Sequence, residues 1–176
     1  MYLLDTGICI DFMRGNLPYA YDLMRKSDPR LFKIPSVVEG ELRAWAETSD
    51  APQKRRWLVE EFLLPFETLP FDHSCALAYA KLRAQLEKAG INLDSNDLLV
   101  AATAVANGAV LVTNDAERLK QVPGLSLESW HEMSLSEQPG QDDEGQAHAT
   151  SSPTASWPQR SSAKTDGMER PGAAKP

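Results

Sequence analysis

The sequence contains few cysteines and no long apolar run, and both absences exclude classes of protein. Its 176 residues include 2 cysteines, Cys9 and Cys75. Neither has another Cys or a His at metal-ligand spacing, so zinc and disulfide scaffolds are excluded and both thiols are expected to be buried and reduced. No apolar run approaches the roughly 18 residues that a membrane span needs, and residues 1–5 lack the pattern of a signal peptide. We therefore expect a cytoplasmic protein that does not bind a membrane.

Basic residues are also in the minority. The chain has 18 Lys and Arg against 25 Asp and Glu, which gives a formal net charge of -7. This balance argues against a protein that coats nucleic acid by bulk electrostatic attraction, so any contact with nucleic acid must be local. Hydrophobic residues make up 42% of the chain, which suffices for one core of ordinary domain size and not for two.

The expected folded domain covers residues 1–133, because the composition changes sharply after Met133. Residues 134–176 contain 7 Ser, 5 Pro and 4 Gly, and Leu135 is their only Leu, Ile, Val or Phe. A segment of this composition cannot bury enough apolar surface to offset the entropy of ordering it. We therefore predict one domain over 1–133 followed by a disordered low-complexity tail over 134–176.

Short apolar runs alternate with amphipathic stretches along the predicted domain, which is typical of a parallel sheet covered by helices. The runs predict strands at 2–4, 31–34, 66–69 and 109–112. The amphipathic stretches predict helices over 7–14, 18–26, 36–47, 51–64, 72–88 and 98–106. Thr6 is expected to cap the first helix, and Ser36 with Glu39 has the spacing of a capping box at the third. The predicted fold class is α/β, with a central parallel sheet sandwiched by helices.

Two of the predicted strands end in acidic residues. Asp5 follows the strand at 2–4, and Asp115 follows the strand at 109–112. Ligands bind beyond the carboxyl ends of the strands in an open parallel sheet, so both carboxylates are candidate ligand-binding groups. Taken singly, each Asp is most simply a helix cap, because its side chain accepts hydrogen bonds from the free amides at a helix start.

Two further acids are predicted to face inward from helices. Rotation by about 100° per residue places Glu41 beside the apolar stripe of its helix, near Trp45, whereas Glu39 points to the other side. Asp97 opens an almost wholly apolar helix. A carboxylate on an apolar face loses hydration and needs a partner, so it is either half of a buried ion pair or a metal ligand.

Four carboxylates that converged without a cation would repel one another strongly. Ligand sets made of oxygen alone suit a hard divalent ion. The acids therefore predict a Mg²⁺ or Mn²⁺ site made of Asp5, Glu41, Asp97 and Asp115. An ion of this kind usually acts on phosphates, because it polarises the phosphoryl oxygen and lowers the pKa of a bound water.

Four short motifs carry a resemblance to a known family. They are Leu3-Leu4-Asp5-Thr6, Pro35-Ser36-Val37-Val38-Glu39-Gly40-Glu41-Leu42, Asn96-Asp97-Leu98-Leu99 and Leu111-Val112-Thr113-Asn114-Asp115. In this order and spacing they resemble the PIN-domain nucleases, and among them the VapC-type toxins of bacterial toxin–antitoxin pairs. The resemblance covers residues 1 to about 131.

The resemblance implies a Mg²⁺- or Mn²⁺-dependent endoribonuclease that hydrolyses phosphodiester bonds of an RNA substrate. It assigns the acidic triad to Asp5, Glu41 and Asp97, in agreement with the argument from burial. It also implies a small cognate antitoxin protein that occupies the active-site groove, and we expect the chain to form a homodimer.

The fourth acidic position departs from the pattern of the family. Many relatives carry an acid and then a Phe where this chain has Arg118 and Leu119. A fourth acid, if one is used, must be Asp115 or Glu117, and we favour Asp115. The departure also leaves open an alternative function, that of a catalytically inactive PIN-fold module that binds RNA or protein.

The densest basic run of the predicted domain is Lys54-Arg55-Arg56-Trp57. Its aromatic residue could stack on a base of an RNA. The simpler interpretation, which we favour, is a solvated helix face with Trp57 buried. Arg43, two residues beyond Glu41, could contact a phosphate from the rim of the site.

Overall fold

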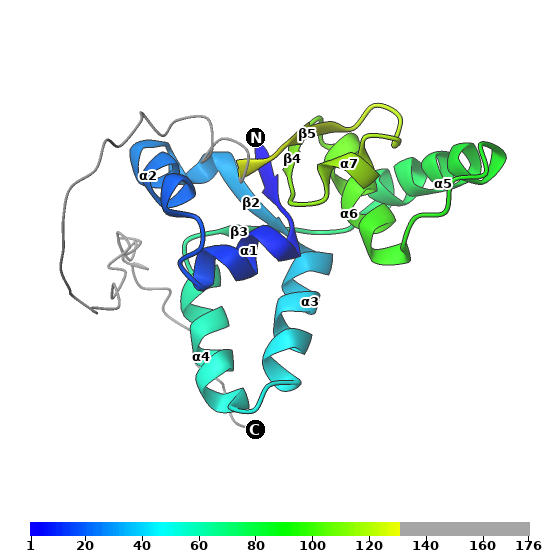
Figure 1. Cartoon of the computed structure of the whole chain (residues 1–176). Coiled ribbons are helices and arrows are strands. Elements are labelled where there is room, and N and C mark those ends of the chain that lie inside the picture. The colour runs from blue at the N-terminus through cyan, green and yellow to red at the C-terminus, as the bar shows by residue number, and fades with distance from the viewer. Residues whose placement is uncertain (131–176) are drawn as a thin grey trace, which may run out of the picture.

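The computed structural model describes residues 1–130, which form a parallel sheet flanked by helices (Figure 1). The strands are β1 (Tyr2–Leu4), β2 (Phe32–Pro35), β3 (Glu67–Leu69), β4 (Val110–Val112) and β5 (Ser126–Glu128). Their order in the sheet is β3-β2-β1-β4-β5, and each neighbouring pair is parallel. The predicted fold class is confirmed.

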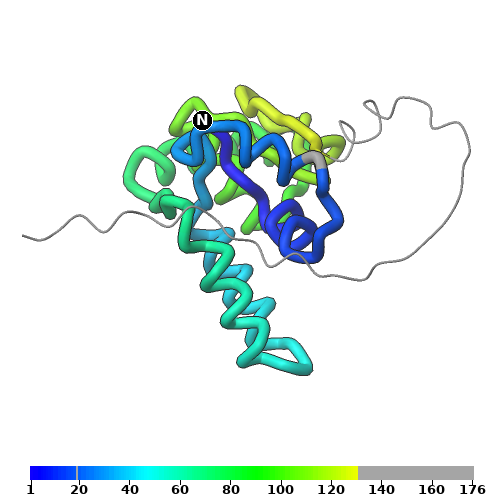
Figure 2. Tube along the Cα trace, turned by 90° about the vertical axis from the view of Figure 1, so that its left-hand side faces the viewer, coloured from blue at the N-terminus to red at the C-terminus, as the bar shows by residue number. Residues whose placement is uncertain are grey.

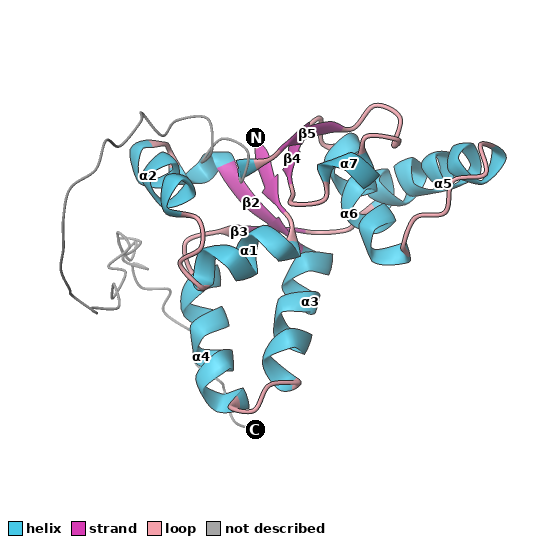
Figure 3. Cartoon of the chain, viewed as in Figure 1, coloured by secondary structure: helices cyan, strands magenta, loops and turns pink. Residues whose placement is uncertain are grey.

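Helices fill the connections between the strands, as Figure 3 shows. They are α1 (Thr6–Met13), α2 (Pro18–Lys26), α3 (Ser36–Glu47), α4 (Pro52–Leu63), α5 (His73–Lys88), α6 (Ser95–Ala106), α7 (Ala116–Leu119) and the short 3₁₀ helix η1 (Pro29–Leu31). Helices α3 and α4 lie side by side and extend away from the sheet as a hairpin (Figure 2). This hairpin is the part of the described chain that projects farthest below the sheet in Figure 1.

The pattern of apolar residues predicts most of these elements to within a few residues. The exceptions are β5, α7 and η1, none of which the pattern predicts. Strand β5 consists of Ser126, Leu127 and Glu128, so one apolar side chain stands between two polar ones and no apolar run marks the strand. Helix α7 has 4 residues, which is too short to display a helical period.

The core lies on both faces of the central strand. Leu3 and Leu4 are consecutive residues of β1 and are 0% and 1% exposed. Consecutive side chains of a strand point to opposite faces, so both faces of the sheet are covered, as a parallel sheet requires. Cys9 and Cys75 are free and buried, which confirms the prediction of two buried thiols.

The predicted caps of two helices are wrong. Helix α1 is capped by Asp5, whose carboxylate accepts the Thr6 N–H at 2.8 Å, and Thr6 is the first helical residue. Helix α3 has Pro35 in the cap position and no side-chain cap. The hydroxyl of Ser36 accepts the N–H of Phe71 at 3.1 Å instead, because the chain that leaves β3 passes over the start of α3. Glu39 instead accepts hydrogen bonds from Thr68 of β3 and from Arg43 of its own helix.

The expectations about membrane spans and about the end of the domain concern the whole chain, whereas the structure describes residues 1–130. Among residues 1–130, no helix has both the length and the apolar character needed to cross a bilayer. The predicted end of the domain at 133 and the predicted tail over 134–176 lie outside the described residues, so both remain predictions.

Candidate active site

Two adjacent strands bring the first predicted acid to the carboxyl edge of the sheet. Leu4 of β1 pairs with Val112 of β4, and the N–H of Asp5 continues this ladder by donating to the Val112 carbonyl at 3.0 Å. The hydroxyl of Thr113, which follows β4, donates to Asp5 Oδ2 at 2.7 Å. Asp5 is therefore fixed by both strands and by the start of α1.

Burial is the main influence on the ionisation of Asp5. It raises the pKa of the carboxyl, although hydrogen bonds from Thr113 and Thr6 act in the opposite direction. The nearby carboxylates of Glu41 and Asp115 raise the pKa further by repulsion. A cation beside Asp5 would relieve both the desolvation and the repulsion.

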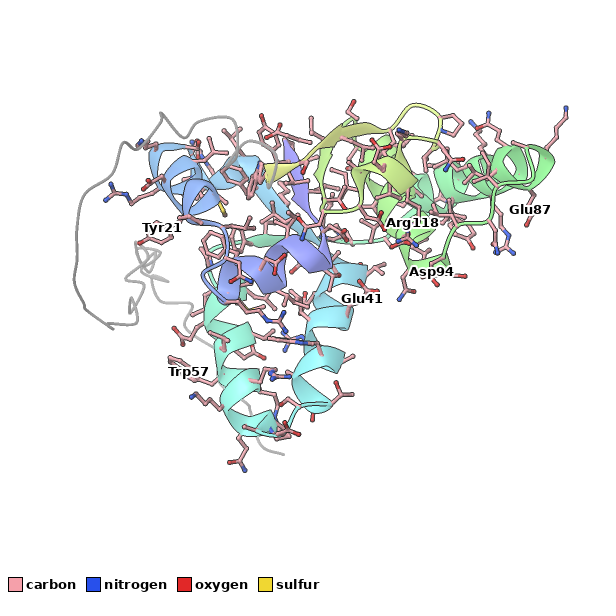
Figure 4. All side chains as sticks on the ribbon, in the orientation of Figure 1. Tyr21, Glu41, Trp57, Glu87, Asp94 and Arg118 are labelled. Atoms are coloured by element: carbon pink, nitrogen blue, oxygen red, sulfur yellow. The ribbon has the colours of Figure 1, made fainter. Side chains whose placement is uncertain are left out.

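Glu41 extends from α3 toward the same place and is held by two neutral donors. The hydroxyl of Thr6 donates to Glu41 Oε2, and the side-chain amide of Asn96 donates to Glu41 Oε1 at 2.8 Å. These bonds join α1, α3 and α6 around one carboxylate. Figure 4 shows Glu41 at the end of α3 nearest the sheet, in the same region as Asp94 and Arg118. The predicted inward direction of Glu41 is thus observed.

Asp97 lies in the first turn of α6 and faces an arginine. Its Oδ2 atom is buried and accepts no hydrogen bond from any residue within 1–130. Nη2 of Arg118 lies 2.6 Å from this oxygen, which is ion-pair distance, but the contact lacks the geometry of a hydrogen bond. Nε of the same guanidinium lies 2.6 Å from Oδ2 of Asp115. Arg118 therefore bridges two of the predicted site residues.

Burial also raises the pKa of Asp97. The guanidinium of Arg118 lowers it, while the carboxylates of Asp5, Asp94 and Asp115 raise it. The negative charges of Glu41 and Asp115 thus act on the pKa of Asp5, and those of Asp5 and Asp115 act on the pKa of Asp97. The structure brings the four predicted acids into one group, called here the acidic cluster: Asp5, Glu41, Asp97 and Asp115.

The cluster includes supporting residues that the sequence did not identify as such. Thr6 and Asn96 orient Glu41, and Asp94 caps α6 by accepting the N–H of Asn96 at 2.9 Å. Both Thr6 and Asn96 stand next to a predicted acid in the chain, and this adjacency is the signal that could have identified them. The alternative fourth acid, Glu117, has a side chain that is 85% exposed and pairs with Lys120, which favours Asp115.

The carboxylates of the cluster are of the right chemical type for a divalent cation, but in this structure they lie too far apart to hold one ion together. Among residues 1–130, no three His, Cys, Asp or Glu side chains are close enough together to hold one ion. All donors of the cluster are carboxylate oxygens, the ligands that Mg²⁺ and Mn²⁺ prefer. The buried Oδ2 of Asp97 without a hydrogen bond is an acceptor for such an ion. In this structure its neighbouring positive charge is Arg118.

The basic run on α4 is arranged differently from the prediction. Trp57 is 64% exposed, so the prediction that it is buried is wrong. The buried side of α4 is occupied by Val59 and Phe62, and Trp57 lies about 200° away from Val59 around the helix. Arg55 stacks over Trp45 with 4.4 Å between the guanidinium carbon and the ring centre. Arg55 of the basic run is therefore engaged in a contact within the chain, whereas the indole of Trp57 is exposed.

The fold and the site together define a class of protein. Its members have a parallel α/β sheet with an acidic cluster beyond the carboxyl ends of two adjacent strands, here β1 and β4. Residues 2–125 match the model of the PIN domain family. The chain is 34% identical over 134 residues to ribonuclease VapC2 of Rickettsia felis, a match that covers 74% of this chain and 98% of the relative. It is 30% identical to the tRNA(fMet)-specific endonuclease VapC of Salmonella typhimurium, with 73% and 97% covered.

Solved structures show the same likeness. The VapBC2 complex of R. felis bound to a promoter DNA fragment has a chain with a TM-score of 0.68 at 32% identity, covering 73% of this chain and 98% of that one. A chain of DNA-bound VapBC from S. typhimurium has a TM-score of 0.70 at 29% identity, with 73% and 97% covered. The chain belongs to the PIN-domain family and, within it, to the VapC ribonucleases. Its function is that of a toxin endoribonuclease.

Proposed function

We propose that the acidic cluster is the active site, that it binds Mg²⁺ or Mn²⁺, and that it hydrolyses a phosphodiester bond of RNA. One observation carries this proposal: carboxylates from four separate segments lie near enough to raise the pKa of Asp5 and Asp97 by repulsion, although no three of them within residues 1–130 are close enough to hold one ion in this structure. The buried Oδ2 of Asp97, which accepts no hydrogen bond within the described chain, supports it. Such a group is costly without a cation, because like charges are held together and partly desolvated.

The ligands would be Asp5, Glu41 and Asp97, with Asp115 assisting from the rim. When bound, the ion supplies positive charge that activates water and stabilises the charge that develops on the phosphate. Thr113 and the Thr6 N–H hold the two oxygens of Asp5. This orientation before substrate binds is what allows an electrostatic site to act without reorganisation.

Thr6 links the two halves of the proposed site. Its backbone N–H donates to Asp5 and its hydroxyl donates to Glu41, so one residue fixes the carboxylates of a strand end and of α3 relative to each other. Asn96 holds the other oxygen of Glu41, one residue before Asp97. The proposed ligands are therefore positioned by contacts between α1, α3 and α6.

We also propose a small antitoxin as the partner of this chain. The relatives of known structure were solved as VapBC complexes. A groove lined by carboxylates is complementary to a guanidinium group, and Arg118 already makes such contacts with Asp97 and Asp115. The expected antitoxin segment carries apolar side chains and an arginine. Pull-down with the product of the adjacent open reading frame tests this partner, and light scattering of the isolated chain tests the expected homodimer.

RNA cleavage with Mg²⁺, with Mn²⁺ and with excess EDTA tests the proposed mechanism. We expect cleavage with either ion and none in EDTA. Cleavage that continues in excess EDTA would contradict the metal mechanism. RNA that is bound but left intact at every metal concentration would favour the alternative of an inactive binding module.

A further inference from the structure

The acidic cluster has a positive charge supplied by its own chain. Among residues 1–130, Arg118 is the only Lys or Arg within ion-pair distance of a member of the cluster. It reaches Asp97 through Nη2 and Asp115 through Nε, each at 2.6 Å. A single guanidinium thus neutralises two acids that come from different segments of the chain, α6 and the turn after β4.

The contacts of Arg118 show that it acts as a positive counter-charge to Asp97 and Asp115. Its side chain is 47% exposed, so solvent reaches part of it. Its contact with the buried Oδ2 of Asp97 is electrostatic, because that oxygen accepts no hydrogen bond within the described chain. Burial opposes the charge on Arg118, but Asp97 and Asp115 outweigh this effect and raise the pKa of Arg118.

We propose that Arg118 is a built-in competitor of the divalent ion: its guanidinium neutralises Asp97 and Asp115 in the metal-free protein and must turn away when the ion binds. The inference rests on the proposed metal site and adds a residue that sets the affinity of that site. Arg118 and a cation on Asp97 would use the same buried oxygen. Two positive charges close together at one carboxylate repel each other, so the two occupants exclude one another.

Competition makes a prediction that a simple structural clamp does not. If the guanidinium must leave, the apparent affinity for metal is reduced by the fraction of molecules in which Arg118 occupies the acids. Removing Arg118 should then tighten metal binding while it weakens the metal-free fold. A clamp that remained paired after the ion bound would still repel the ion, so Arg118→Gln would tighten metal binding in that case too. Arg118→Lys separates the two cases, because it keeps the charge and loses the bridge between the two acids. A permanent clamp predicts unchanged affinity in Arg118→Lys, whereas competition predicts a gain.

The test is calorimetric titration of Mn²⁺ alone into the full chain and its variants, without RNA. We expect Arg118→Gln to bind Mn²⁺ at least about tenfold more tightly than the original chain. We also expect Mn²⁺ to raise its melting temperature by more than it raises that of the original chain. The matched control is Arg83→Gln, which removes the same charge from an arginine on α5 that is 54% exposed and pairs with Glu87 at 2.8 Å. This control should leave Mn²⁺ affinity within about twofold.

Each result has a definite meaning. If the original chain binds Mn²⁺ and Arg118→Gln binds it equally well or more weakly, the competition is wrong and the proposed metal site stands. If neither the original chain nor any variant binds Mn²⁺ at millimolar concentration, the metal site and the competition both fail. Arg118→Lys is the second variant, since it keeps a charge that maintains the fold. Its single ammonium cannot present two separate edges to two carboxylates, so we expect a smaller gain in affinity, and no gain would count against the proposal.

Discussion

The hairpin of α3 and α4 and the acidic cluster differ in how the negative charge of their acids is compensated. In the hairpin, Arg43 pairs with both Glu39 and Glu60, and Arg56 lies 3.5 Å from Glu47. In the cluster, Arg118 lies at ion-pair distance from Asp97 and Asp115, whereas Asp5 and Glu41 have no ion pair within residues 1–130. Paired charges on an exposed hairpin contribute little to stability. An excess of negative charge raises the free energy of the free protein, and the proposed cation would remove this cost.

Two glutamates of one helix divide between these regions. Glu39 and Glu41 are two residues apart on α3. Glu39 accepts from Thr68 at 2.8 Å and from Arg43 at 2.9 Å, and these bonds lower its pKa. Glu41 receives only neutral donors among the described residues, Thr6 and Asn96. The direction of each side chain around the helix, set by a rotation of about 200° between them, decides which region it joins.

The largest expected effect is the loss of cleavage in Asp97→Asn and Asp5→Asn. Each change removes a charge that binds the ion and keeps the size of the side chain, so cleavage should fall by more than the roughly 10–100-fold typical of an outer-shell partner. The fold should not suffer, because repulsion within the cluster decreases. RNA cleavage and metal-free melting measure the two effects, with Asp22→Asn on the exposed side of α2 as the control.

The outcome that would contradict this assignment is specific. Equal loss of stability in Asp5→Asn and Asp97→Asn without metal, together with unchanged Mn²⁺ binding, would mean that the acids are structural. The cluster would then resemble the hairpin, with its charges compensated inside the fold.

The second-largest expected effect is the loss of cleavage in Glu41→Gln, for which Glu39→Gln is the comparison. Glu41→Gln should reduce cleavage strongly, since it removes a proposed ligand. Glu39→Gln should leave cleavage near the original rate and lower the free energy of unfolding by about 1 kcal/mol or less, because the pair with Arg43 is partly exposed. Parallel assays of cleavage and of urea unfolding separate the two. Cleavage lost in Glu39→Gln and retained in Glu41→Gln would reverse the assignment.

The pH dependence of stability should have opposite signs for cluster and surface acids. Burial raises the pKa of Asp5 and Asp97 above the ordinary value of 3.8. The folded state therefore binds their protons more tightly than the unfolded state, and stability gained from these groups increases as the pH falls from neutral through the raised pKa. Asp72 is the opposite case. Bonds from Ser74 and from the Cys75 N–H lower its pKa to about 2, so its contribution is present above pH 3.8 and is lost as the pH falls toward 2.

Urea unfolding of the metal-free chain over a pH series measures this contrast. In Asp97→Asn, the free energy of unfolding should increase less on acidification than in the original chain. In Asp72→Asn, it should decrease less as the pH falls toward 2. A slope that Asp97→Asn leaves unchanged would show that Asp97 is not desolvated in the folded protein.

The alternation of apolar runs and helices was enough to predict a parallel sheet, because strands buried on both faces must be apolar throughout. It also indicated Asp5 and Asp115, since strand ends are visible as the places where apolar runs stop. Contacts between distant segments could not be obtained this way. The bond from Phe71 to Ser36 and the bridge from Arg118 to Asp97 depend on how loops return to the sheet, and no period in the sequence reports that.

The smallest expected effect is on the hairpin itself, where Trp57→Ala should change the free energy of unfolding by about 0.5 kcal/mol or less, because the indole is 64% exposed. Trp45 is the matched comparison. It is half-buried and lies beneath the guanidinium of Arg55 and near that of Arg14, so Trp45→Ala should cost more than about 1 kcal/mol. Trp57→Ala should leave Mn²⁺ binding unchanged. If it instead weakens the binding of RNA severalfold with metal affinity intact, the exposed indole contacts substrate, and the hairpin takes part in RNA recognition beyond the proposed metal site.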